Sequence, residues 1–70
     1  NGQLADFYKS LALISQAIEM NPRNGLYYYG RGRVYLLSGE KEKAMADFKK
    51  AAELDDEDAQ NYLNTFAKTH

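Results

Sequence analysis

The side chains that could support catalysis are few and widely separated in this chain. Nucleophilic catalysis needs a hydroxyl or thiol beside a base, but the sequence has no cysteine and a single histidine, His70, at its last position. We expect Ser10 at a helix crossing, Ser15 within a helix and Ser38 in a turn. This distribution predicts structural roles for all four residues and argues against an enzyme.

The acidic run at residues 55–58 is the only place in the sequence where possible metal ligands are closely spaced. A calcium loop of the EF-hand type needs a glycine at its sixth position and a glutamate at its twelfth. Counting from Asp56, those positions hold Asn61 and Ala67, so the match fails. Because acidic side chains stabilise the first turn of a helix, we expect capping residues here, and we predict no metal and no cofactor.

The segment 26–37 is the part of the chain best suited to binding a partner, since it holds four tyrosines, two arginines and no acid. Tyrosine and arginine often anchor protein interfaces and can also stack on unpaired bases. Helical spacing divides these side chains between two faces. We assign Tyr28 and Tyr35 to the core, whereas Tyr29 and Arg33 follow a second stripe.

Charges of both signs alternate between residues 40 and 53. At helical spacing, such a mixture is typical of a solvated face with weak ion pairs. We therefore assign this face, including Asp47, to solvent. The formal net charge of −1 likewise disfavours nucleic acid as a partner.

The composition predicts one small folded domain, residues 1–70. Hydrophobic residues make up 44% and charged residues 27%, a balance typical of globular rather than disordered chains. No apolar run is long enough to cross a bilayer, so we expect no membrane partner. We expect a cytoplasmic location, with the periplasm as the alternative because both fit a chain without cysteine. Since it opens without Met, we expect a section of a longer protein.

The apolar, glycine and proline positions predict four helices and no strand. Between residues 3 and 20, apolar residues recur every three or four positions, on one helical face. The turn at 21–25 ends this helix. Further helices are expected at about 26–37, 41–54 and 57–68, with Gly39 as a left-handed C-cap of the second. The prediction is an all-α fold of four short antiparallel helices.

The two halves of the chain align when the sequence is shifted by about 34 residues. The identical pairs are Ala12 with Ala46, Ala17 with Ala51, Glu19 with Glu53, and Tyr28 with Tyr62. The expected helix ends and turns also fall in phase. The first and third helices are therefore equivalent, as are the second and fourth.

This period, with two helices per unit, resembles the tetratricopeptide repeat family. Residues 25–58 are similar to one complete repeat, residues 3–20 to the second helix of a preceding repeat, and residues 59–70 to the first helix of a following repeat or to a capping helix. The matching positions are Tyr28, Gly32, Tyr35, Gly39, Ala44, Phe48 and Ala51. The resemblance implies a helix-turn-helix stack of one full repeat flanked by half repeats.

Three positions depart from the family pattern. Asp56 stands where the family has a closing proline, and Gly30 is an additional glycine within a helix. Phe66 replaces the small residue at the helix crossing of the last helix. Because this side chain would keep a partner helix at a distance, we expect the last helix to act as an end cap.

The resemblance implies a protein–protein interaction module that binds a peptide segment of a partner in a concave groove. First helices of successive repeats line the groove, and the implied residues are Leu26, Tyr29, Arg33, Leu36, Gln60 and Leu63. Some family members hold a peptide carboxylate with a lysine and an asparagine in this groove. Tyr29 and Arg33 occupy those places here, so that clamp is absent.

Two alternatives remain beside the groove. The first helix lacks its repeat partner, which predicts an uncovered stripe at Leu4, Phe7 and Ile14. This stripe favours self-association into a homo-oligomer. The other alternative is single-stranded nucleic-acid binding through the tyrosines, Arg31 and Arg33, with an affinity that falls steeply as salt rises. The net charge argues against this alternative.

Overall fold

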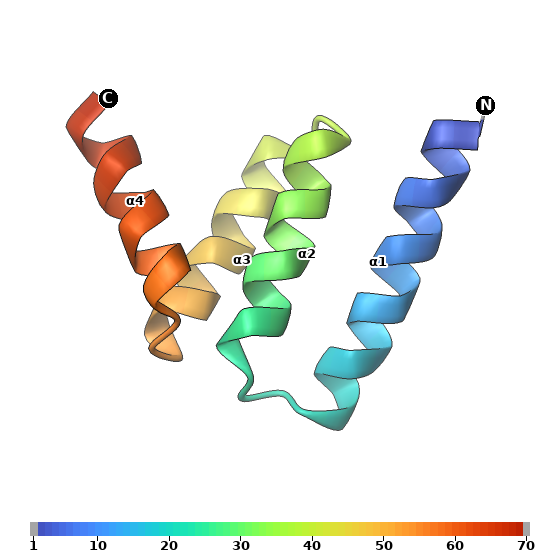
Figure 1. Cartoon of the computed structure of the whole chain (residues 1–70), viewed down its shortest axis with the longest axis horizontal. Coiled ribbons are helices and arrows are strands. Elements are labelled where there is room, and N and C mark those ends of the chain that lie inside the picture. Colours follow the sequence, from blue (N-terminus) through green and yellow to red (C-terminus); the bar gives the residue numbers. More distant parts are fainter. Residues whose placement is uncertain (1, 70) are drawn as a thin grey trace.

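The computed structural model describes residues 2–69, and the side chains of residues 5–68. Its helices are α1 (Gly2–Met20), α2 (Gly25–Leu37), α3 (Lys41–Glu53) and α4 (Glu57–Thr69). Residues 2–69 contain no strand. Successive helices run in opposite directions (Figure 1). The predicted all-α fold of four antiparallel helices is confirmed.

The core lies around α3. α2 packs most extensively against α3, and α4 also packs on α3, whereas α1 lies against α2 (Figure 1). The side chains without exposed surface are Ala44, Phe48 and Ala51 of α3, and Ala59 of α4. Among the described side chains of α1, Ile18 is the buried one. The helices α2, α3 and α4 therefore form the tightly packed part of the molecule.

Two turns of the same type end α2 and α3. At the end of α2, Gly39 has a φ of 88°, and the amide of Glu40 donates a hydrogen bond to the carbonyl of Tyr35 at 2.8 Å. α3 ends in the same way, with Asp55 at a φ of 69° and the amide of Asp56 donating to Ala51 at 3.0 Å. This pattern is the Schellman motif, so the predicted left-handed cap at Gly39 is confirmed.

Side-chain caps begin α2 and α4. Asn24 Oδ1 accepts a hydrogen bond from the amide of Leu26 at 3.0 Å, and Asp56 Oδ2 accepts one from the amide of Ala59 at 2.9 Å. Each cap satisfies an amide that has no partner within its own helix. Asp56, at the place of the family's closing proline, thus has the predicted capping role.

Gly32 allows the close approach of α2 and α3. A Cβ atom at this position would lie 2.8 Å from Cε1 of Phe48 and 3.1 Å from the carbonyl oxygen of Ala44. The absence of a side chain therefore leaves room for the buried Phe48 ring. Gly30, on the same helix, differs, because a Cβ atom there would have no neighbour within 4 Å.

We expect opposite effects on stability when these two glycines are replaced by alanine. Gly30→Ala should raise the free energy of unfolding by about 1 kcal/mol, because alanine favours a helix over glycine and nothing obstructs its methyl group. Gly32→Ala should lower it by roughly 1–3 kcal/mol, because the methyl group overpacks the core. Urea denaturation followed by circular dichroism measures both; a shift in the same direction for the two variants would contradict this account.

Candidate functional site

The residues predicted to line the groove come from α2 and α4. Leu26 and Arg33 are exposed; the half-buried members are Tyr29, Leu36, Gln60 and Leu63. Gln60 is tied to the neighbouring helix, because its Nε2 donates a hydrogen bond to the carbonyl of Ala52 at 3.1 Å. The set therefore combines side chains open to a ligand with side chains that brace the helices.

An aromatic row connects the two helices through the core. The ring of Phe48 in α3 lies 5.4 Å from that of Tyr29 and 4.4 Å from that of Tyr62, measured between centroids. Tyr62 in turn stacks on Phe66, with the centroids 6.4 Å apart. Tyr29 was predicted only as a groove residue, but its ring also packs on the core. Through the ring of Phe48, the row joins both α2 and α4 to α3.

Arg33 is the cation of this surface. Its guanidinium carbon lies 6.0 Å from the centroid of the Tyr29 ring, within the range of a cation–π interaction. Arg33 is exposed, and the ion pairs found among the described side chains do not include it. The guanidinium can therefore still accept an anionic partner.

An ion pair with a buried carboxylate lies on another face of α2. Arg31 Nε donates to Asp47 Oδ2 and Arg31 Nη2 donates to Asp47 Oδ1, each at 2.8 Å. Hydrogen bonding to Asp47 raises the pKa of Arg31 above its ordinary value. Asp47 is only 6% exposed, so its assignment to a solvated face is wrong. Alternating charges along α3 do not reveal that this position faces an arginine of α2.

Two tyrosines enclose the ion pair. The guanidinium carbon of Arg31 lies 5.6 Å from the ring centroid of Tyr28 and 6.0 Å from that of Tyr35. Arg31 Nη1 also lies 3.5 Å from Ser15 Oγ of α1, which links three helices. Tyr28 and Tyr35 are half-buried rather than core residues. The spacing of three and four residues around Arg31 was the available signal for this cluster.

The predicted self-association stripe is only partly accessible. Phe7 and Ile14 are half-buried, and the side chain of Leu4 lies outside the described residues. The most exposed large apolar side chains of α1 are Tyr8, Leu13 and Met20. We therefore expect a self-association surface on α1 to include these exposed side chains as well.

The groups considered for catalysis or metal binding do not converge in the described part of the chain. Ser15 lies against Arg31, and His70 falls outside the described residues. Among those residues, no cluster of three or more histidine, cysteine or acidic side chains has a geometry that could hold a metal. Within the same part of the chain, no helix has the length and hydropathy needed to span a membrane.

Two helix pairs that repeat with a fixed period and pack around a small crossing residue define a helical-repeat protein. Residues 25–58 match the family model of the tetratricopeptide repeat. These residues belong to this family. Tetratricopeptide repeats are non-catalytic folds that generally mediate protein–protein interactions.

The chain is also similar to part of a larger protein in mammals. It is 37% identical over 62 residues to serine/threonine-protein phosphatase 5 of Homo sapiens and of Rattus norvegicus. The alignment covers 89% of this chain and 12% of each relative, so the chain spans a small part of their length. No solved structure gave a significant match.

Proposed function

We propose that the chain binds a peptide segment of a partner protein in a concave groove between α2 and α4. In this proposal, residues 25–58 form the full repeat of the stack and residues 3–20 and 59–70 form its flanking halves. The observation that carries the proposal is the exposed, unpaired Arg33 on the ring of Tyr29, on a helix without an acidic residue.

The chemistry of the groove favours a ligand with both apolar and anionic groups. Leu26 is 57% exposed and offers apolar surface at the start of α2. Arg33 can pair with a carboxylate through two parallel hydrogen bonds. Arginine and tyrosine also contribute strongly where they anchor an interface. A peptide with an aliphatic side chain and a carboxylate would satisfy both positions.

We expect the double variant Leu26→Ser with Arg33→Ala to weaken partner binding about tenfold or more, since each anchor contributes on the order of 1 kcal/mol. Both side chains are exposed, so the helical circular dichroism spectrum should not change. Tyr29 is left intact because its ring packs on Phe48. The measurement is quantitative mass spectrometry of proteins captured from a lysate, followed by titration of the captured partner.

A matched control removes one leucine and one cationic side chain outside the predicted groove. Leu37 is 70% exposed at the end of α2, and Lys49 is exposed on α3. The variant Leu37→Ser with Lys49→Ala should retain the affinity of the unchanged chain. Equal binding by both double variants would refute the groove.

Self-association through α1 is the second candidate, and the exposed Leu13 and Met20 favour it. Both side chains would gain from burial against another copy. No contact in the described residues favours nucleic acid over a protein partner.

A further inference from the structure

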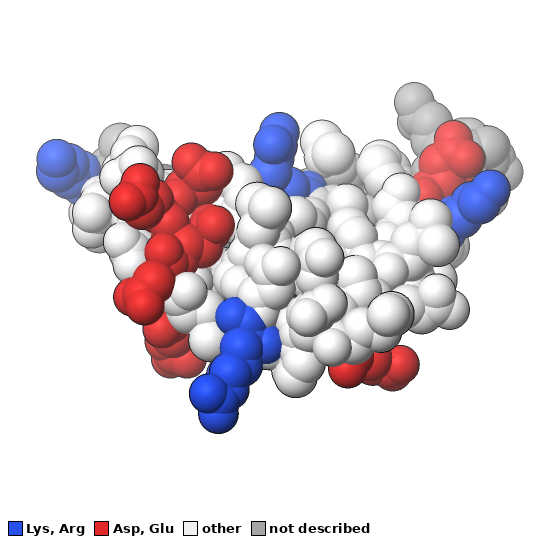
Figure 2. Space-filling model, turned by 60° about the horizontal axis from the view of Figure 1, so that its bottom comes forward, with Lys and Arg blue, Asp and Glu red and all other residues white. Residues whose placement is uncertain are grey.

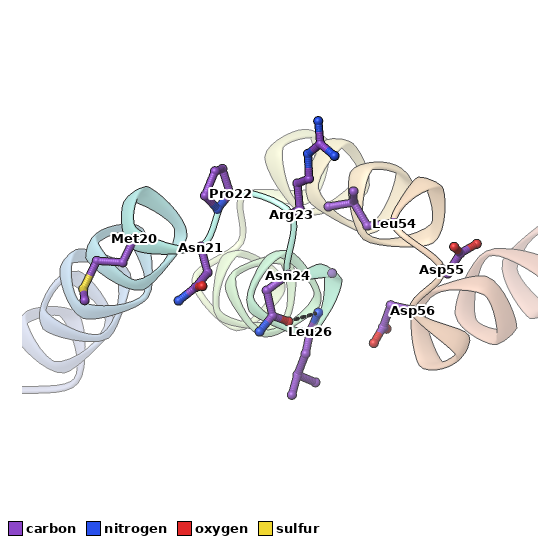
Figure 3. A pocket seen from close by; sticks show the side chains of 10 residues that line it. Met20, Asn21, Pro22, Arg23, Asn24, Leu26, Leu54, Asp55 and Asp56 are labelled. Carbon is purple, nitrogen blue, oxygen red and sulfur yellow. Dashed lines mark hydrogen bonds between the residues drawn. The ribbon is translucent and has the colours of Figure 1, made fainter.

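The turns α1–α2 and α3–α4 lie at the same end of the molecule (Figure 1) and border an open hollow of about 710 Å³. The 34-residue period explains this juxtaposition, because Met20 corresponds to Leu54 and Asn21 corresponds to Asp55. Figure 3 shows the two turns on either side of the start of α2. The hollow thus arises from the repeat itself.

Large apolar side chains from three segments border the hollow. Met20 of α1 is 81% exposed and Leu26 of α2 is also exposed, while Leu54, after α3, is half-buried. Gly25 also lines the hollow, and a Cβ atom there would lie 2.9 Å from the carbonyl oxygen of Ala51. The start of α2 is therefore held closely against the end of α3, which gives the hollow a defined shape.

The hollow is lined by charged side chains of both signs. Asp55 and Arg23 both line it and are exposed, and neither takes part in the ion pairs found among the described side chains. Glu57 and Asp58 are also exposed but do not line the hollow. Figure 2 shows acidic side chains gathered toward the α4 edge, with a basic side chain next to them and an uncharged surface beyond. A cation beside an apolar group would complement the Asp55 side of the hollow.

We propose that the hollow docks a partner peptide in which an apolar side chain stands next to a lysine or arginine. The apolar side chain packs on part of the apolar lining that Met20, Leu26 and Leu54 contribute, and the cation pairs with the carboxylate of Asp55. This surface is separate from the proposed groove, because Tyr29 and Arg33 do not line it; Leu26 borders both.

The test titrates the isotopically labelled chain with three acetylated, amidated peptides and follows its backbone amides by nuclear magnetic resonance. The probe is GSLKSG, and the matched peptides GSLESG and GSSKSG remove the cation and the apolar group in turn. We expect GSLKSG to shift the amides of Met20, Leu26 and Asp55. Each matched peptide should bind at least about threefold more weakly, the range of one exposed ion pair or one small apolar contact.

Two variants test the role of the charge. Asp55→Asn removes the carboxylate while keeping a residue type that tolerates the positive φ at this position, and it should weaken GSLKSG binding about threefold. Asp58→Asn removes an equal charge that does not line the hollow and should change the affinity much less. Circular dichroism checks that both variants remain helical.

Several results would overturn the proposal. Equal affinity for the three peptides, or equal effects of the two variants, would remove the role of Asp55. Shifts concentrated around Arg33 would assign the probe to the groove instead, and the absence of shifts would show that the hollow takes no such peptide. If light scattering without peptide shows a mass that rises with concentration, and the same amides shift, the occupant is a second copy of the chain.

Discussion

Replacing Phe48 with alanine should remove about 3–5 kcal/mol from the free energy of unfolding. Phe48 is the large side chain with no exposed surface, and it contacts the rings of Tyr29 and Tyr62. Its removal would leave a cavity where three helices meet. A domain of this length has roughly 4–10 kcal/mol of stability in total. The variant should therefore be partly or largely unfolded at 25 °C.

Urea denaturation followed by circular dichroism measures this loss, with Phe66→Ala as the matched control. Phe66 stacks on Tyr62 but is 39% exposed, so its truncation should cost only about 1 kcal/mol. Phe48→Leu should fall between the two, because it keeps most of the apolar volume. Equal losses for Phe48→Ala and Phe66→Ala would show that the core does not centre on α3.

Removing one partner of the Arg31–Asp47 pair should cost more than removing both. Arg31→Met leaves the carboxylate of Asp47 unpaired, with only 8% of its side chain exposed, and should destabilise the chain by about 3 kcal/mol. The double variant Arg31→Met with Asp47→Leu should recover most of this loss, because apolar residues of similar volume can replace a buried ion pair. A double-mutant cycle from urea denaturation gives the coupling energy.

The exposed pair of Lys43 and Glu40 provides the comparison. Their charged atoms are 3.7 Å apart and both side chains are more than half exposed, so the coupling energy should be below about 1 kcal/mol. A coupling energy for Arg31 and Asp47 no larger than this would contradict the buried-pair interpretation. Because the pKa of Arg31 is raised, its stabilising effect is present below the ordinary arginine pKa and is lost only as the pH rises through the higher value. We therefore expect the arginine to contribute equally across the neutral range.

Local signals explain which parts of the fold were predictable. Gly39 and the ends of the helices follow from residue types within a few positions of each other. The crossing of Gly32 with Phe48 belongs to a family pattern whose physical basis is the pairing of a small residue with a large one. The confirmed features are those that neighbouring residue types specify or that the family pattern already contains.

The features that the sequence did not reveal depend on side-chain contacts between helices that the family pattern does not include. Asp47 has the charge pattern of a surface residue, and its burial follows from the position of Arg31, 16 residues earlier. The packing of Tyr29 on Phe48 likewise requires the crossing geometry of α2 and α3. The hollow could be anticipated only by combining the repeat period with the knowledge that both turns lie at one end of the molecule.

The ion pair of Arg31 and Asp47 also bears on the order in which such a stack can assemble. Both of its short hydrogen bonds join α2 to α3, whereas α1 approaches only the remaining Nη1 through Ser15. The α2–α3 hairpin can therefore neutralise these charges without α1. A helix that packs on this face of α2 meets an arginine whose desolvation cost is already offset by its pairing with Asp47. The α2–α3 hairpin can thus present a preformed surface against which a neighbouring helix packs.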